Sequence, residues 1–325
     1  MSEQFVSGQR PDLAFVFPGQ GSQKVGMLSE LADRYAQVGD TFAEASDALG
    51  YDVWKLAQQG PQEQLNLTER TQPVLLTASL AVWRVWRAEG GSLPSLLAGH
   101  SLGEWSALVA ADVLPFADAV RLVRERGRLM QEAVPAGQGG MAAIIGLSDQ
   151  QIIEACEQAS EGKVVAPVNF NSPGQVVIAG DAAAVERATA LCKSAGAKRA
   201  LALPVSAPFH TSLMQPAADG LVAQVEATNF QATTIPVVHN VHARTESDPQ
   251  AIKKLMIEQI SSPVLWVDCV QALKNRGVAI MVECGPGKVL SGLTKRIDKS
   301  IVSLATESPQ ELEAALAETK GEQND

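Results

Sequence analysis

Five consecutive residues, Gly99-His100-Ser101-Leu102-Gly103, have the Gly-x-Ser-x-Gly spacing of a nucleophile elbow. In an elbow a strand ends abruptly, a serine adopts a strained backbone conformation, and a helix begins at once; the glycines leave clearance that a Cβ would block. Apolar residues 96–98 precede the motif, and residues 104–111 read as the opening of a buried helix. We therefore predict that Ser101 is a nucleophile at a helix N-terminus, where backbone N–H groups can stabilise an oxyanion. The pattern also occurs by chance in ordinary turns, so the flanking strand and helix are what favour this interpretation.

A serine hydroxyl is a weak nucleophile near neutral pH, so Ser101 needs a base, and the chain contains four histidines. His100 lies inside the elbow, and His239 and His242 flank a short apolar strand, where polar or packing roles are the simplest interpretation. His210 follows a proline-rich loop, which is a good place to hold a base because loops often carry function. Position alone leaves His210 open between a base and a structural histidine.

The elements that must position these residues follow an alternating pattern. The apolar run at residues 13–17 ends in a glycine-rich turn and predicts a buried parallel strand. Alternation of strands with helices predicts an α/β fold, a parallel sheet with helices on both faces. The other expected elements are helices at 31–49, 71–87 (with Pro73 in its first turn) and 116–132, strands at 236–238 and 279–283, and a charged, peripheral tail after Pro309.

Residues 134–204 differ in sequence pattern from the rest of the chain and are predicted to form a separate unit. Their expected elements follow the order βαββαβ, which is that of a ferredoxin-like subdomain. The predicted organisation is therefore a discontinuous large domain, 1–133 and 205–325, with an insertion at 134–204. The alternative is that the inserted strands extend the main sheet. The expected strands are 141–146, 164–169, 176–179 and 200–203, and the expected helices are 149–159 and 183–195.

The composition indicates a cytoplasmic globular enzyme. The chain has 325 residues, of which 46% are hydrophobic and 19% charged. It has no apolar run of 18 residues, and residues 1–5 lack the basic-then-apolar order of a signal peptide, so we expect no membrane association. The net charge of −10 argues against nucleic acid as a partner. Lys295 and Arg296 are weak candidates for a local basic patch that receives an acidic protein.

The cysteines and one glycine-rich turn are interpreted as structural. Four widely spaced cysteines, without a C-x-x-C pair, predict reduced core thiols and neither a disulfide framework nor a metal site. The turn at 285–288 lacks the spacing of a phosphate-binding loop, so it is interpreted as the start of a helix.

Five motifs in a fixed order, covering the chain from about Leu13 to Ile297, resemble the malonyl-CoA:acyl carrier protein transacylases of bacterial type II fatty acid synthesis. The resemblance implies an α/β-hydrolase-like large domain with a ferredoxin-like insertion. It implies malonyl-CoA as substrate, acyl carrier protein as acceptor and no cofactor, and we expect a monomer. The motifs are FPGQGSQ (17–23), GHSLGE (99–104), RGRLMQ (126–131), PFH (208–210) and GPGKVL (285–290).

The resemblance also implies roles for individual residues. It makes Ser101 the acyl acceptor and His210 its general base, and it assigns the oxyanion hole to the backbone N–H groups of Gln20 and Leu102. The histidine would be oriented by the backbone carbonyl of Gln259. A triad carboxylate is then not required, and the reserve candidates for one are Asp268 and Glu283.

Two further residues would determine which acyl group the site accepts. From its helix alone, Arg126 is no better a candidate than Arg121, Arg124 or Arg128. The resemblance singles out Arg126 as the partner of the malonate carboxylate, a task that the planar guanidinium suits. Phe209 resembles the malonyl-selective loop of related polyketide acyltransferases, although Ser206-Ala207-Pro208 depart from that pattern.

Three other functions remain possible from the sequence. A polyketide pathway could use the same malonyl transfer, and a serine esterase or thioesterase could use the same elbow to pass the acyl group to water. A catalytically silent subunit that binds carrier protein could keep the fold. The retained Ser101, His210 and Arg126 argue against the silent subunit.

Overall fold

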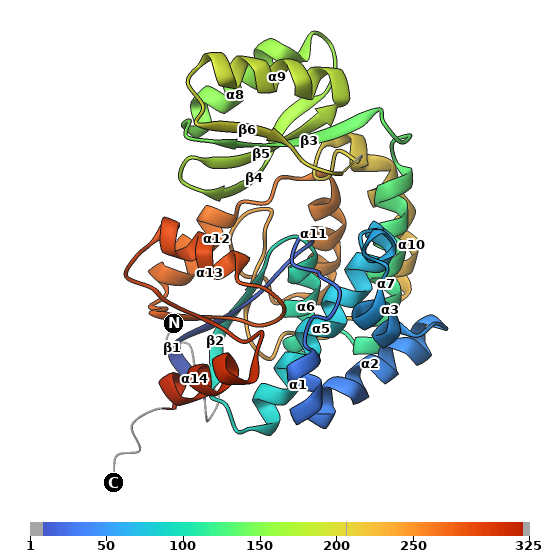
Figure 1. Cartoon of the computed structure of the whole chain (residues 1–325), viewed down its shortest axis with the longest axis vertical. Coiled ribbons are helices and arrows are strands. Elements are labelled where there is room, and N and C mark those ends of the chain that lie inside the picture. The colour runs from blue at the N-terminus through green and yellow to red at the C-terminus, as the bar shows by residue number, and fades with distance from the viewer. Residues whose placement is uncertain (1–8, 206, 321–325) are drawn as a thin grey trace.

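A five-stranded parallel sheet forms the centre of the larger part of the computed structural model, which describes residues 9–205 and 207–320 (Figure 1). Residues 1–5 and Ser206, considered above, lie outside the described residues. The strand order is β7-β2-β1-β8-β9, and every neighbouring pair is parallel. This confirms the predicted parallel sheet. The strands are β1 (Gln9–Phe17), β2 (Leu93–Gly99), β7 (Val237–Val238), β8 (Ile280–Glu283) and β9 (Val302–Ala305).

Both faces of this sheet are buried, which explains the continuous apolar run of β1. Phe15 and Phe17 face one core, where the Phe15 ring packs edge-on against two tryptophans of α5 (Thr68–Ala88), with centroids 4.9 and 5.3 Å apart. Ala14 and Val16 face a second core with residues of α12 (Trp266–Asn275) and α13 (Val289–Ile297). Successive side chains of a strand point to opposite faces, so burial on both faces removes the polar alternation.

The helices of the larger part differ from the predicted set mainly in number. The predicted helix at 31–49 is two helices, and the predicted helix at 71–87 begins earlier, so that Pro73 lies in its second turn. The helices are α1 (Ser29–Arg34), α2 (Ala36–Leu49), α3 (Val53–Gln59), α4 (Gln62–Leu65), α5 (Thr68–Ala88), α6 (Leu102–Ala110), α7 (Phe116–Glu132), η1 (Ser212–Met214), α10 (Gln215–Ala227), α11 (Pro249–Ser261), α12 (Trp266–Asn275), α13 (Val289–Ile297) and α14 (Pro309–Thr319).

A separate four-stranded antiparallel sheet is formed by the inserted segment, and Figure 1 shows it above the larger part with α8 and α9 on its outer face. Its strand order is β4-β5-β3-β6. The inserted strands therefore do not extend the main sheet. The elements in chain order are β3 (Gly139–Ile145), α8 (Asp149–Ser160), β4 (Val165–Ser172), β5 (Gln175–Asp181), α9 (Ala182–Ser194) and β6 (Arg199–Ala202).

The structure contradicts the expectation for the C-terminal tail and agrees with the one for the cysteines. The tail after Pro309 is not peripheral, because α14 buries Leu312, Ala315 and Leu316 in the main core. All four cysteines are buried and free, as predicted. Within residues 9–205 and 207–320, no helix is long and apolar enough to cross a membrane, and no group of acidic, histidine and cysteine side chains could hold a metal ion.

Candidate active site

The elbow lies at the carboxyl edge of the parallel sheet, between β2 and α6. Phe17 and Gly99 are paired residues at the ends of adjacent strands, so the turn after β1 and the elbow after β2 leave the sheet side by side. A Cβ on Gly99 would lie 1.9 Å from the Gly103 carbonyl carbon, and one on Gly103 would lie 2.0 Å from the Phe17 oxygen. Ser101 has φ 51° and ψ −107°, a strained conformation for a residue with a side chain. The geometry matches the predicted strand, strained serine and helix.

His210 faces Ser101 from the loop after the inserted segment. Its Nε2 lies 2.7 Å from Ser101 Oγ, and its Nδ1 lies 3.0 Å from the backbone oxygen of Gln259. A carbonyl oxygen only accepts hydrogen bonds, so Nδ1 carries the proton and Nε2 is free to accept the serine proton. The pairing predicted for Ser101, His210 and Gln259 is therefore present in the structure.

The electrostatic environment keeps His210 neutral. Burial, reinforced by the nearby Arg126 cation, lowers the pKa of the His210 imidazole to about 3, although the Gln259 carbonyl opposes this shift. A neutral imidazole is the form that can accept a proton. His210 also has a positive φ of 64°, so both partners of the Ser101–His210 contact are held in uncommon backbone conformations.

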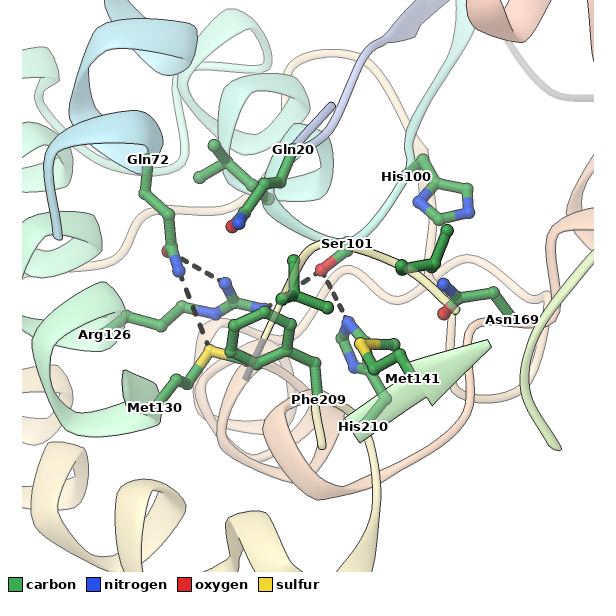
Figure 2. Close-up of a pocket in the computed structure, with 13 residues that line it drawn as sticks. Gln20, Gln72, His100, Ser101, Arg126, Met130, Met141, Asn169, Phe209 and His210 are labelled. Carbon is green, nitrogen blue, oxygen red and sulfur yellow. Dashed lines mark hydrogen bonds between the residues drawn. The ribbon is translucent and has the colours of Figure 1, made fainter. Parts of the chain in front are cut away.

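Arg126 on α7 is buried and points at the same serine (Figure 2). Its Nη2 donates to Ser101 Oγ at 3.3 Å and to Gln259 Oε1 at 2.9 Å, and its Nη1 donates to Gln72 Oε1 at 2.8 Å. These acceptors are all uncharged. Burial lowers the pKa of the guanidinium to about 10, so it remains a cation near neutral pH. A buried cation with neutral partners beside a nucleophile suits an anionic acyl group.

A cavity of about 120 Å³ lies between these side chains. A cavity of this size has room for a short acyl group on Ser101. Ser101 lies between Arg126 on one side and His210 on the other, and the Phe209 ring also lines the cavity (Figure 2). The lining also includes Gln20 and Leu102, the predicted oxyanion-hole residues.

Comparison with known proteins identifies the family. Residues 14–315 match the family model described as an acyl transferase domain. The chain is 60% identical over 305 residues to a malonyl CoA-acyl carrier protein transacylase of Salmonella typhimurium, covering 94% of this chain and 99% of the relative. The chain belongs to the malonyl-CoA:acyl carrier protein transacylase family.

Solved structures of this transacylase family have the same fold. An acyl carrier protein S-malonyltransferase of Vibrio cholerae is 58% identical with a TM-score of 0.92, covering 93% of this chain and 99% of the other. A second structure shows a malonyl-transacylase in complex with a type II polyketide acyl carrier protein; it is 54% identical with a TM-score of 0.93, covering 94% of this chain and 99% of the other.

A larger groove of about 560 Å³ adjoins the transacylase cavity and shares part of its lining, including Gln20, His100 and Asn169. His100 points away from the serine, and its Nε2 lies 2.7 Å from Asn171 Oδ1 in the groove wall. The groove continues to the start of α13, the helix whose last turn carries Lys295 and Arg296, both exposed.

The reserve candidates for a triad carboxylate are not placed to act as one. Glu283 is fully buried, but its carboxylate accepts the backbone N–H groups of Leu290 and Ser291, at 3.0 and 2.7 Å, and so caps α13. Asp268 is exposed on α12. The backbone carbonyl of Gln259 occupies the position that a carboxylate would take beside His210.

Sequence reasoning missed several polar residues that hold the site together. Gln72 belongs to no motif, and because the four residues before it are also polar, nothing in the local sequence singles it out. No motif marks Asn240, yet its Oδ1 accepts the Ser101 backbone N–H at 2.8 Å and its Nδ2 donates to the Gly99 oxygen at 2.7 Å. His239 has the packing role expected of it, and its partner, which the sequence does not indicate, is the buried Glu104 carboxylate.

Proposed function

We propose that this chain moves a malonyl group from malonyl-CoA to the phosphopantetheine thiol of acyl carrier protein through a malonyl ester of Ser101. The observation that carries the proposal is the convergence on Ser101 Oγ of a neutral base at 2.7 Å and a buried cation at 3.3 Å. A neutral base activates the hydroxyl, and the cation selects an acyl group that ends in a carboxylate. The name of the Salmonella typhimurium relative describes this reaction.

The first half-reaction forms the ester. His210 Nε2 takes the hydroxyl proton as Ser101 Oγ attacks the thioester carbonyl carbon. When the tetrahedral intermediate collapses, the carbon–sulfur bond breaks and His210 returns the proton to the departing CoA sulfur. We assign the oxyanion of this intermediate to the backbone N–H groups of Gln20 and Leu102; losing one such donor costs about 100- to 1000-fold in rate in other enzymes.

The second half-reaction reverses these steps with a different thiol. The phosphopantetheine thiol gives its proton to His210 and attacks the ester carbonyl, the bond to Ser101 Oγ breaks, and the proton returns to that oxygen. All bonds exchanged are thioester and ester bonds, so the scheme includes no metal or redox cofactor. The carrier protein complex of the related malonyl-transacylase supports acyl carrier protein as the acceptor.

The finer architectural and cellular assignments belong to the same proposal. The strand–Ser–helix elbow supports an α/β-hydrolase-like large domain over 1–133 and 205–325, and the β4-β5-β3-β6 order supports a ferredoxin-like subdomain at 134–204. We propose a cytoplasmic monomer that serves fatty acid synthesis.

Intact-mass measurement tests the function directly. Incubation with malonyl-CoA should add one malonyl group to the protein, and Ser101→Ala should abolish the adduct. Addition of carrier protein should discharge the adduct onto the carrier thiol. An adduct that persists in Ser101→Ala would refute the nucleophile, and discharge to water at the same rate with or without carrier protein would indicate a thioesterase.

A further inference from the structure

A buried carboxylate that the proposed reaction does not use lies directly beneath the elbow. Glu104, in the first turn of α6, has no exposed surface. Its carboxylate accepts from His239 Nδ1 at 2.7 Å, from the Asn240 backbone N–H at 3.1 Å and from Gln259 Nε2 at 2.7 Å. A buried charge is costly unless it is hydrogen-bonded, and these donors stabilise it as an acceptor.

The Gln259 side chain connects Glu104 to the guanidinium. Its Nε2 donates both to Glu104 Oε2 and to the Ser101 backbone oxygen, at 2.7 and 3.0 Å, while its Oε1 accepts from Arg126 Nη2 at 2.9 Å. An amide has a donor end and an acceptor end. If it flipped, Oε1 would face two oxygens and Nε2 would face a guanidinium that can only donate. The two acceptors on Nε2 therefore fix which end meets Arg126.

Gln259 separates Glu104 from Arg126, and this separation matters for recognition of the substrate carboxylate. Arg126 contacts the uncharged oxygens of Gln72, Gln259 and Ser101. The Glu104 charge favours the cation through space, with Gln259 between them. A carboxylate paired directly with Arg126 would have to be displaced by the substrate, whereas one set behind an amide stabilises the buried cation and leaves it available.

We infer that Glu104 is a positioning residue for carboxylate recognition, which orients the Gln259 amide and through it Arg126. This inference rests on the proposed function. Glu104 also contacts Asn240, which holds the Ser101 backbone, so replacing it will slow acyl transfer in general. The quantity specific to the inference is the ratio of the acylation rates with malonyl-CoA and with acetyl-CoA, which lacks the carboxylate.

Two substitutions of Glu104 separate the role of its oxygen from a purely structural role. Glu104→Leu removes the acceptor for Gln259 Nε2, and the malonyl-to-acetyl ratio should fall about 10- to 100-fold, as expected for loss of a hydrogen bond to a charged group. Glu104→Gln can keep an oxygen toward Gln259 and Asn240 with its NH₂ toward His239, whose ring can change tautomer. That variant should retain the ratio of the unchanged protein or exceed it.

A matched control and a double variant complete the rate test. Glu283→Gln alters another fully buried carboxylate, one that contacts α13 and does not line the cavity, and should leave the ratio unchanged. In an Arg126→Ala background, adding Glu104→Leu should not lower the ratio further, because both act through one guanidinium. The inference is overturned if Glu104→Leu slows both substrates by the same factor, or if Glu104→Gln lowers the ratio as much as Glu104→Leu.

Two measurements keep the test decisive if a variant or the proposed function fails. If Glu104→Leu does not fold, Gln259→Leu keeps the backbone carbonyl for His210 and should lower the ratio similarly; an unchanged ratio would refute the inference. Side-chain ¹⁵N NMR of Arg126 needs no turnover. Its Nη signals should broaden or merge in Glu104→Leu, because the Gln259 amide that contacts the guanidinium is no longer held by Glu104. Absence of malonyl transfer by the unchanged protein would refute the proposed function alone, and unchanged Arg126 signals in Glu104→Leu would refute the inference.

Discussion

Replacing Arg126 by alanine should separate malonate recognition from acyl transfer. The guanidinium is buried with Nη2 3.3 Å from Ser101 Oγ, so an acyl group on that oxygen brings its carboxylate within reach. A hydrogen bond to a charged group contributes roughly 1.5–3 kcal/mol, so a bidentate contact contributes about 3–6 kcal/mol. Since about 1.4 kcal/mol changes a rate tenfold, acylation by malonyl-CoA should fall about 10²- to 10⁴-fold relative to acylation by acetyl-CoA.

The assay is single-turnover acylation followed by intact mass, with both thioesters at concentrations below saturation. Arg128→Ala is the matched control, because Arg128 lies on the same helix but is only half-buried and pairs with Glu125 and Glu132. Its ratio of malonyl to acetyl acylation should equal that of the unchanged protein. Removing Arg126 also leaves the Gln72 and Gln259 oxygens without a donor, so thermal unfolding must confirm that the variant is folded. Equal loss of both activities in a folded Arg126→Ala protein would refute the reasoning.

Three further predictions follow from the geometry of the site. Because burial lowers the pKa of His210 to about 3, the base is already unprotonated above that pH, and the acylation rate should stay constant between pH 5 and 8. A fall in the rate as the pH drops through the ordinary histidine pKa would contradict this burial effect. Gly99→Ala should yield no folded protein, because its Cβ would lie 1.9 Å from the Gly103 carbonyl carbon; normal soluble expression and circular dichroism would show that the turn can relax. Asn240→Ala should lower the free energy of unfolding by about 1–3 kcal/mol, since the Ser101 N–H loses its acceptor and the buried Gly99 carbonyl loses its donor, and an unchanged urea midpoint with an unchanged slope would contradict this.

The outline of the fold could be predicted because the relevant signals are local. The apolar run of β1 and the elbow after β2 identify buried parallel strands, since burial on both sheet faces removes polar alternation. These local signals fail where the burial of a segment depends on packing against a distant part of the chain. Residues 309–319 are rich in charge, yet Leu312 and Leu316 cover the main core from one side of α14. A helix with several acidic residues and only two large apolar side chains resembles a solvated tail until its neighbour is known.

The elbow at Ser101 could be predicted from the sequence, because strand, glycines and helix are consecutive and the steric demand is local. The family resemblance also pointed to His210, Arg126 and Gln259, but it could not place them. They are separated from Ser101 by up to 158 positions, and only the fold brings them to one cavity. The resemblance already implies that a carbonyl orients His210; only the packed structure shows that contact and the position of Glu104 beneath the site. Hydrogen-bond partners at such separations depend on how strands and loops pack, which no local pattern records.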